Sequence, residues 1–306
     1  MSARIALVTA RGARDLDEDL PPLVAAFAVQ GAHAEVAVWD DPQVDWGGFD
    51  VVLLRSAWDY TERIGEFLAW VERTAALTRL LNPPAVVRWN CDKHYLLDLE
   101  RAGLPIVPSE FVEPGQDPAA RLDELLARHG CHELVVKPAV GAGSRDARRH
   151  HRDARGEILG HIRPLLAAGR SVLMQPYLPG VDRYGETALV YIGGSFSHAF
   201  RKGALLPLGA GATAGLFATE EITARTPAAD ERAVGERVLA GIPFGDLLYA
   251  RIDLIRGAQD APCVLELELA EPSLYFQHGA DSARKLARAT LARLGEAPAR
   301  PAAAVV

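Results

Sequence analysis

Two short stretches of this sequence constrain its fold more than any other part. Residues 134–138 read as a β-strand that carries Lys137 directly to a glycine loop at residues 141–145. Residues 251–253 and 266–268 read as two adjacent strands, and because side chains alternate along a strand, Glu266 and Glu268 share one face while Leu267 points to the core. With Asp253, these strands predict three carboxylates on one face of a sheet.

Three carboxylates gathered on one face indicate a metal site. They repel one another at pH 7 unless cations hold them, and Mg²⁺ prefers one or two carboxylates together with phosphate oxygens. The glycine loop offers backbone N–H groups to phosphates, and Lys137 adds a point charge. The alternatives are a strand with one solvated face and a bare turn between strands. The pairing of the two stretches favours a site for a nucleotide and a metal.

Composition and charge narrow the class of protein. A chain of 306 residues predicts two or three packed units, and a net charge of −7 argues against a general nucleic-acid binder. No apolar run approaches the roughly 20 residues of a membrane span, so we expect a cytoplasmic protein without a membrane partner. Cys91, Cys131 and Cys263 lack metal or disulfide spacing, and His150 and His151 are expected on a solvated, arginine-rich surface. The sequence does not determine the oligomeric state, and a homo-oligomer is one of the alternatives.

The first ninety residues have the rhythm of a parallel α/β unit. Strands are expected at residues 4–9, 34–39 and 50–54, with a helix at 20–30. Ligands of such folds bind beyond the carboxyl ends of the strands. Polar residues that follow two of these ends could clamp a small zwitterionic substrate, or could simply form a turn that opens a helix at 61–78. These residues are Thr9, Arg11, Arg55, Trp58, Asp59 and Tyr60.

The rest of the chain alternates helices and strands. Residues 82–84 are expected to form a linker, and residues 203–215 a loop that covers the substrate. The expected helices lie at 90–103, 118–128, 153–168, 228–240 and 281–294. The expected strands lie at 106–109, 134–138 and 171–178, in a hairpin at 186–192 and 195–202, and in the two carboxylate strands, before a frayed tail at 296–306. We therefore divide the chain into residues 1–90, 91–180 and 181–306.

The order of six of these elements resembles the ATP-grasp superfamily of carboxylate–amine ligases, in particular its prokaryotic glutathione synthetase and ribosomal-S6-modifying branches. The resemblance covers roughly residues 90–273. It implies an α/β fold in which an N-terminal Rossmann-like parallel domain binds substrate. Two α+β lobes that clasp ATP would follow, the central lobe carrying the glycine loop and the C-terminal lobe carrying the metal-binding strands.

The resemblance also implies roles for individual residues. Those assigned to ATP are Lys93, Lys137, Gly141, Gly143, Ser144, Gln175, Pro176, Tyr177, Leu178, and either Asp182 or Glu186 on the ribose, with Glu186 preferred. Asp253, Glu266 and Glu268 would hold two Mg²⁺ ions, and Arg251, Lys137, Arg201 and Lys202 would stabilise the transferring phosphoryl group. Glu271 and Ser273 would contact the acceptor substrate. Gln175 and Glu268 depart from the usual acidic residue and asparagine of the family.

The activity implied by the resemblance is ATP-dependent amide formation through an acylphosphate, on a small polar substrate similar to an amino acid. Within the superfamily, the chain is similar to the D-cycloserine synthetase type of antibiotic biosynthesis, in which an aminooxy amino acid closes onto its own carboxylate. An intermolecular dipeptide or glutathione-synthetase-like ligase stays open. So do two other classes, a nucleotide-binding regulatory protein without turnover and a kinase.

Overall fold

The N-terminal part forms a four-stranded parallel sheet in the computed structural model, which describes residues 2–209 and 221–295. Its strands β1 (Arg4–Thr9), β2 (His33–Val38), β3 (Val51–Ser56) and β4 (Arg79–Leu81) stand in the order β2-β1-β3-β4. The helices are α1 (Leu20–Val29) and α2 (Ile64–Leu77), with short 3₁₀ turns η1 (Trp46–Gly48) and η2 (Trp58–Glu62). Every residue of β3 is buried, as a parallel strand covered on both faces requires. The predicted parallel α/β unit is confirmed.

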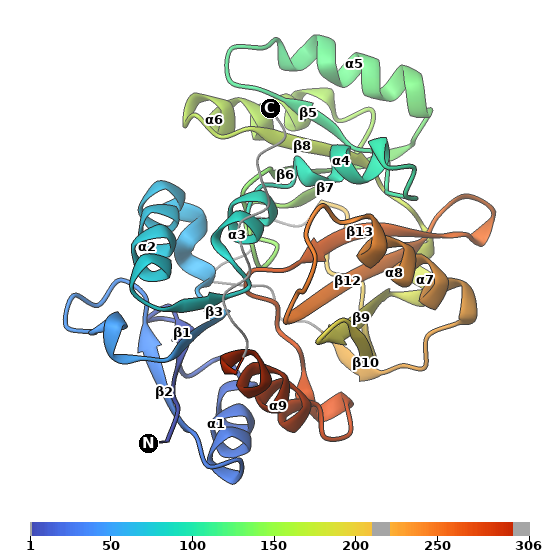
Figure 1. Ribbon diagram of the computed structural model, residues 1–306. Coiled ribbons are helices and arrows are strands. Elements are labelled where there is room, and N and C mark those ends of the chain that lie inside the picture. The colour runs from blue at the N-terminus through green and yellow to red at the C-terminus, as the bar shows by residue number, and fades with distance from the viewer. Residues whose placement is uncertain (1, 210–220, 296–306) are drawn as a thin grey trace.

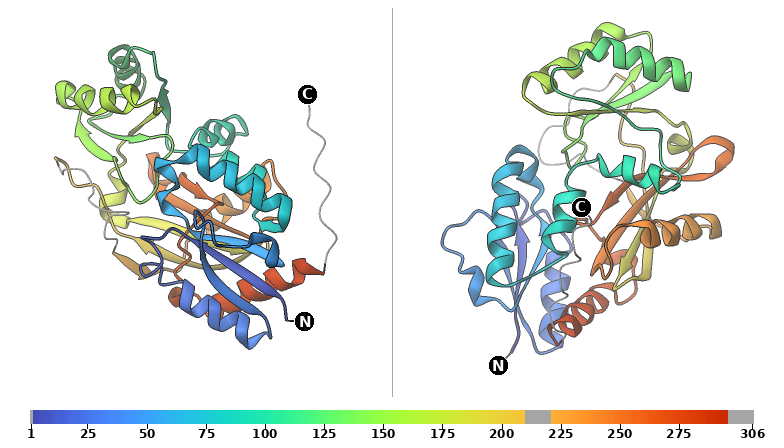
Figure 2. Two further views of the ribbon diagram at one scale, coloured as in Figure 1. Left: turned by 90° about the vertical axis from the view of Figure 1, so that its left-hand side faces the viewer. Right: turned by 45° about the horizontal axis from the view of Figure 1, so that its top comes forward.

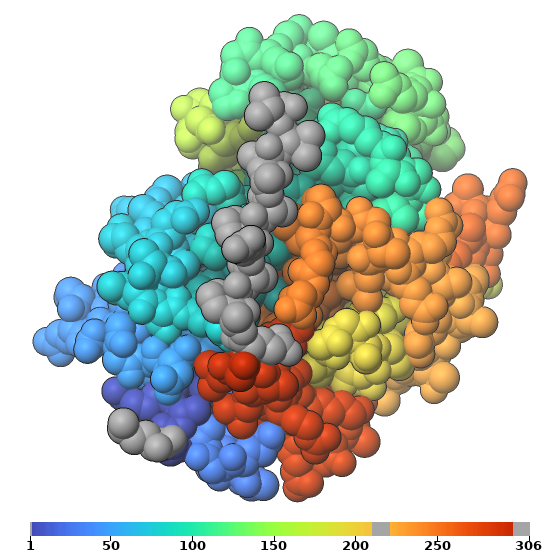
Figure 3. All heavy atoms as spheres, in the orientation of Figure 1, coloured from blue at the N-terminus to red at the C-terminus, as the bar shows by residue number. Residues whose placement is uncertain are grey.

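The central lobe carries an antiparallel sheet in the order β5-β8-β6-β7. The strands are β5 (Glu110–Val112), β6 (Glu133–Pro138), β7 (Arg148–His151) and β8 (Val172–Pro176), and helices α5 (Pro118–His129) and α6 (Arg155–Ala167) pack on the sheet. The strand expected at 106–109 is wrong, because Ile106 makes only an isolated bridge to Val264 and the paired strand begins at Glu110. This lobe forms the green upper part of the molecule in Figures 1 and 3.

The expected solvated surface at His150 and His151 is also corrected. Both lie in β7, whose alternation turns His150 inward, where it is buried. Its Nε2 lies 3.1 Å from Nδ1 of His161 on α6, and His161 Nε2 lies 3.0 Å from the carbonyl oxygen of Asp146. The neighbouring arginines suggested exposure, whereas His150 is the one buried residue of this strand.

The C-terminal lobe is a five-stranded antiparallel sheet in the order β11-β10-β9-β12-β13. Its strands are β9 (Glu186–Ile192), β10 (Ser195–Lys202), β11 (Ile222–Ala224), β12 (Tyr249–Arg256) and β13 (Pro262–Glu268). Helices α7 (Gly180–Tyr184), α8 (Ala229–Gly241) and α9 (Ser282–Leu294) and the turns η3 (Ala258–Asp260) and η4 (Phe276–His278) complete it. The predicted hairpin and both carboxylate strands are present. Part of the expected loop at 203–215, and the tail at 296–306, lie outside the described residues.

The N-terminal domain and the C-terminal lobe share a core. Helix α9 packs beside α1, and one apolar cluster joins Ile5 and Phe27 to Phe200 and Leu286. Figure 2 shows α9 against the N-terminal domain. A second apolar cluster joins Phe111 and Leu173 of the central lobe to Leu189 of the C-terminal lobe. No helix of residues 2–209 and 221–295 is long and apolar enough to cross a membrane.

Residues 82–84 do not form a separate linker. They connect β4 directly to α3 (Pro84–Asn90), and a turn then leads to α4 (Tyr95–Arg101). Two buried asparagines in this segment hold the carboxylate strands. Asn82 Nδ2 donates to the carbonyls of Tyr249 at 3.0 Å and Leu269 at 2.8 Å, and its Oδ1 accepts from Leu248 N at 2.7 Å. Asn90 bonds the backbone of Leu267 and Leu269 in the same way. This segment therefore fixes β12 and β13 against the rest of the molecule.

Candidate active site

A cavity of about 590 Å³ receives residues from all three parts of the chain. The central lobe supplies β6, the glycine loop and the end of β8, and the C-terminal lobe supplies β9, β10, β12 and β13. The N-terminal domain supplies the segment after β1 and the turn η2. The sequence-predicted residues that line it are Trp58, Tyr60, Lys93, Lys137, Gly141, Gly143, Ser144, Gln175, Pro176, Tyr177, Leu178, Glu186, Lys202, Arg251, Glu266, Glu268, Glu271 and Ser273.

Two lysines, Lys93 and Lys137, line the cavity near the glycine loop. Lys93 Nζ donates to the Gly141 carbonyl at 2.6 Å and lies 3.0 Å from Glu266 Oε1. Burial lowers the pKa of Lys137, with the Glu266 carboxylate opposing that shift. An anion in the cavity would oppose this shift by stabilising the ammonium form of Lys137. The loop itself turns through the positive φ of Gly143 (62°) and Ser144 (58°).

The segment after β8 forms one wall of the cavity. Gln175 is buried and its Nε2 donates to Ser109 Oγ at 3.0 Å, so the residue that departs from the family pattern holds the chain before β5. Tyr177 O–H donates to Asp182 Oδ1 at 2.6 Å, and Arg149 lies against the same carboxylate. Asp182 therefore does not line the cavity, whereas Glu186 does.

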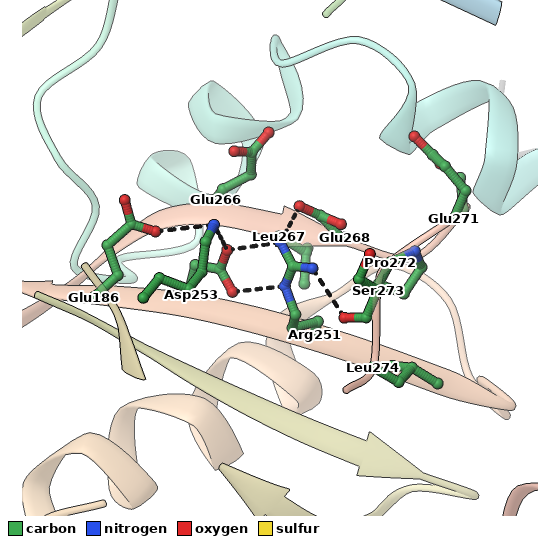
Figure 4. Close-up of polar contacts among 12 residues, drawn as sticks. Glu186, Arg251, Asp253, Glu266, Leu267, Glu268, Glu271, Pro272, Ser273 and Leu274 are labelled. Atoms are coloured by element: carbon green, nitrogen blue, oxygen red, sulfur yellow. Dashed lines mark hydrogen bonds and ion pairs between the residues drawn. The ribbon is translucent and has the colours of Figure 1, made fainter. Parts of the chain in front are cut away.

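The pairing of β12 with β13 brings the three predicted metal ligands together. Asp253 pairs with Glu266, and Arg251 pairs with Glu268, across β12 and β13. Asp253 is fully buried and accepts from Lys202 Nζ at 3.0 Å and from Arg251 Nε and Nη2 at 2.9 Å each. Figure 4 shows these contacts, with Arg251 also bound to Glu268.

The charges of this cluster are set by competition between burial and neighbouring cations. Burial would raise the pKa of Glu266, but Lys93, Lys137 and Lys202 outweigh it and lower it to about 2. Burial raises the pKa of Glu268 to about 8; Arg251 opposes this shift, and the charges of Asp253 and Glu266 add to it. The cluster is therefore short of positive charge at Glu268.

A divalent cation would supply the positive charge that Glu268 lacks. Within the described ranges 2–209 and 221–295, no three His, Cys, Asp or Glu side chains already stand in a metal-binding arrangement. Lysine and arginine nitrogens instead occupy the carboxylate oxygens. Mg²⁺ takes hard oxygen donors, carboxylates together with phosphate oxygens, so the residues present fit the ion.

Several predicted residues lie away from the cavity. Arg55 is fully buried and its Nη2 donates to the Pro272 carbonyl at 2.9 Å. Asp59 accepts from Trp39 Nε1 at 2.8 Å and pairs with Arg63. Thr9 is buried at the end of β1, and Arg11 is exposed in the turn that follows.

Arg201 also lies outside the cavity lining. Its Nε donates to the Tyr184 carbonyl at 2.9 Å, while its neighbour Lys202 faces the cavity because adjacent strand residues point to opposite faces.

Sequence reasoning missed the acidic segment after β1. Asp15, Asp17, Glu18 and Asp19 line the cavity, and the carboxylate of Asp19 accepts the backbone N–H groups of Leu274 at 2.6 Å and Phe276 at 2.9 Å. The cluster of acids between a strand and a helix was the available signal, but it has no periodicity that would set it apart from an ordinary loop.

Comparison with known proteins identifies the family. Residues 5–82 match the model of the N-terminal domain of D-cycloserine synthetase DcsG. The cycloserine biosynthesis protein DcsG of Streptomyces lavendulae is 42% identical over 298 residues, which cover 95% of this chain and 98% of that protein. A crystal structure of D-cycloserine synthetase DcsG is 40% identical with a TM-score of 0.89, covering 95% of this chain and 100% of that one.

A more distant structure shares the fold. The ATP-grasp ligase PsnB, in its complex with a variant precursor, Mg and ADP, is 21% identical with a TM-score of 0.64, covering 96% of this chain and 99% of that one. The expected ATP-grasp fold is thereby confirmed. The chain has the ATP-grasp fold and belongs to the family of D-cycloserine synthetase DcsG.

Proposed function

We propose that this protein is an ATP-dependent ligase that forms D-cycloserine by closing an open-chain amino acid onto its own carboxylate. The observation that carries the proposal is 42% identity to a cycloserine biosynthesis protein over 95% of this chain, a span that includes the N-terminal domain. D-cycloserine is a cyclic amide whose ring nitrogen is bonded to oxygen. Cutting that amide leaves a serine whose side-chain oxygen carries an amino group, so the aminooxy amino acid is the simplest substrate.

The triphosphate would lie between the glycine loop and the carboxylate strands. Lys93 and Lys137 would contact its phosphates, the segment 175–178 would flank the adenine, and Glu186 would accept from the ribose hydroxyls. We place two Mg²⁺ ions at Asp253, Glu266 and Glu268, where they would neutralise phosphate charge. Lys137 lines the cavity next to the glycine loop, and a phosphate there would stabilise its ammonium form against the effect of burial.

In the reaction, a substrate carboxylate oxygen attacks the γ-phosphorus, ADP leaves, and an acylphosphate forms. The nitrogen then attacks the acyl carbon, and phosphate leaves as the ring closes. The protein contributes positioning and charge, with Arg251 and Lys202 beside the transferring group. An acylphosphate hydrolyses in water, so the cavity would also have to shield it from solvent.

A phosphate-release screen tests the proposal. The wild-type protein with ATP and Mg²⁺ should release phosphate with the aminooxy amino acid and yield D-cycloserine by mass. Pairs of ordinary amino acids should release little phosphate and give no dipeptide mass. A dipeptide product would indicate an intermolecular ligase, a stable phosphorylated product a kinase, and nucleotide binding without release a regulatory protein. Each of those results would overturn the proposal.

A further inference from the structure

The segment 271–276 is held along its backbone by side chains from two parts of the chain. Trp58 Nε1 donates to the Glu271 carbonyl at 3.1 Å, and Arg55 Nη2 donates to the Pro272 carbonyl at 2.9 Å. Arg251 Nη1 donates to the Ser273 carbonyl at 3.0 Å. With the bonds from Leu274 and Phe276 to Asp19, the clamp leaves the Glu271 side chain on a rigid support at the cavity wall.

Glu271 differs in its partner from the three predicted metal ligands. Asp253, Glu266 and Glu268 are each bound by a lysine or arginine. Among the described residues, no lysine or arginine forms an ion pair with Glu271; the Tyr60 hydroxyl is its neighbour and lowers the pKa of Glu271, against the effect of burial. Burial raises the pKa of Tyr60 well above its usual value of 10, so this hydroxyl stays neutral. Figure 4 shows Glu271 beyond the end of β13, apart from the cluster around Arg251.

We propose that Glu271 is the general base that accepts the proton from the attacking nitrogen, and that Arg55, Trp58 and Tyr60 position it. The inference rests on the proposed function. In the step, the nitrogen lone pair forms the bond to the acyl carbon while the bond from that carbon to the phosphate oxygen breaks. The nitrogen loses one proton to the Glu271 carboxylate, phosphate leaves with its electron pair, and the neutral ring amide remains.

The chemistry of the step requires such a group. A nitrogen that attacks an acylphosphate becomes positively charged until it loses a proton, and a carboxylate already neutralised by lysine or arginine is a poor acceptor. Burial raises the pKa of Glu271 to about 7, with the Tyr60 hydroxyl and Lys93 opposing, so the carboxylate is basic enough to take the proton. The charged and titratable groups around it are Tyr60, Cys91, Lys93, Tyr249, Arg251, Glu266 and Glu268.

The test separates the two half-reactions in the Glu271→Gln variant, whose amide keeps the size of the side chain. Acylphosphate is trapped with hydroxylamine as the hydroxamate, and D-cycloserine is measured in parallel from the aminooxy amino acid. We expect ring closure to fall by about 10²–10⁴-fold, with a much smaller loss in hydroxamate formation, so that the ratio of hydroxamate to D-cycloserine rises. Glu72→Gln, at an exposed ion pair on α2, is the matched control and should change neither rate.

A pH profile and chemical rescue distinguish a base from a structural residue. Wild-type ring closure should fall as the pH drops through the pKa of Glu271, and this limb should be absent in Glu271→Gln. Formate should partly restore ring closure to Glu271→Ala, since it can enter the vacated space as a base.

Ring closure at the wild-type rate in Glu271→Gln would overturn the inference. Equal loss of both half-reactions, or a rise in KM alone, would do the same by giving Glu271 a structural or ammonium-binding role. Absence of hydroxamate and D-cycloserine in the wild type would instead refute the proposed function, and with it the inference.

Discussion

Replacement of Asn82 by alanine tests how the N-terminal segment holds the carboxylate strands. The side chain is fully buried and makes three hydrogen bonds to backbone groups of Leu248, Tyr249 and Leu269. A buried hydrogen bond contributes about 1 kcal/mol net, so the free energy of unfolding should fall by about 3 kcal/mol. Any backbone group left without a partner increases the loss.

Urea unfolding followed by tryptophan fluorescence and circular dichroism measures this loss. Thr78→Val is the matched control, because Thr78 Oγ1 makes a single bond of 2.7 Å to the Phe49 carbonyl and should lose only about 1 kcal/mol. The difference between the two variants is the informative quantity. If Asn82→Ala loses no more stability than Thr78→Val, the three bonds do not hold the strands and the reasoning is refuted.

Three further predictions follow from the site and its surroundings. Glu266→Gln should lower turnover by about two orders of magnitude or more while circular dichroism stays native, because it removes charge at the phosphate site from a partly exposed side chain; a near-normal rate would contradict the metal assignment. Arg55→Ala should reduce stability and kcat, and Asp59→Ala stability alone, with the substrate KM little changed in both; a selective rise in that KM would restore them as substrate ligands. Burial, with Arg148 and His150, lowers the pKa of His161 to about 4, so the unfolded chain takes up the proton first as the pH falls and up to roughly 3 kcal/mol is lost between pH 6.5 and 4; urea titrations of His161→Gln should lack that loss.

Local patterns allowed much of the fold to be predicted. The hairpin at Glu186–Lys202 and the strands around Asp253 and Glu266 follow from alternation and turn residues, which act over a few positions. His150 was misplaced because flanking arginines indicated a solvated surface, while pairing of β7 with β6 buries it. The buried bonds of Asn82 were also unpredictable, because their partners lie 166 to 187 positions away.

Some residues of the candidate site could likewise be placed from local sequence patterns, and others could not. The glycine loop, Lys137 and the carboxylate strands could be placed from motif order, because short segments carry them. The cluster after β3 could not be resolved, since Arg55 and Trp58 bond the backbone of residues more than 200 positions away. From their residue types alone, both were predicted to be substrate ligands. Only the tertiary contacts show that Arg55 lies behind the cavity wall.

Transfer of ¹⁸O from substrate to phosphate is the most direct test of carboxylate activation. The aminooxy amino acid labelled with ¹⁸O in both carboxylate oxygens is incubated with the protein, ATP and Mg²⁺, and phosphate and D-cycloserine are analysed by mass spectrometry. The proposed route predicts one ¹⁸O atom in each phosphate released and one in the carbonyl of each D-cycloserine formed. Phosphate without label, released alongside D-cycloserine, would contradict the acylphosphate and with it the ligase mechanism.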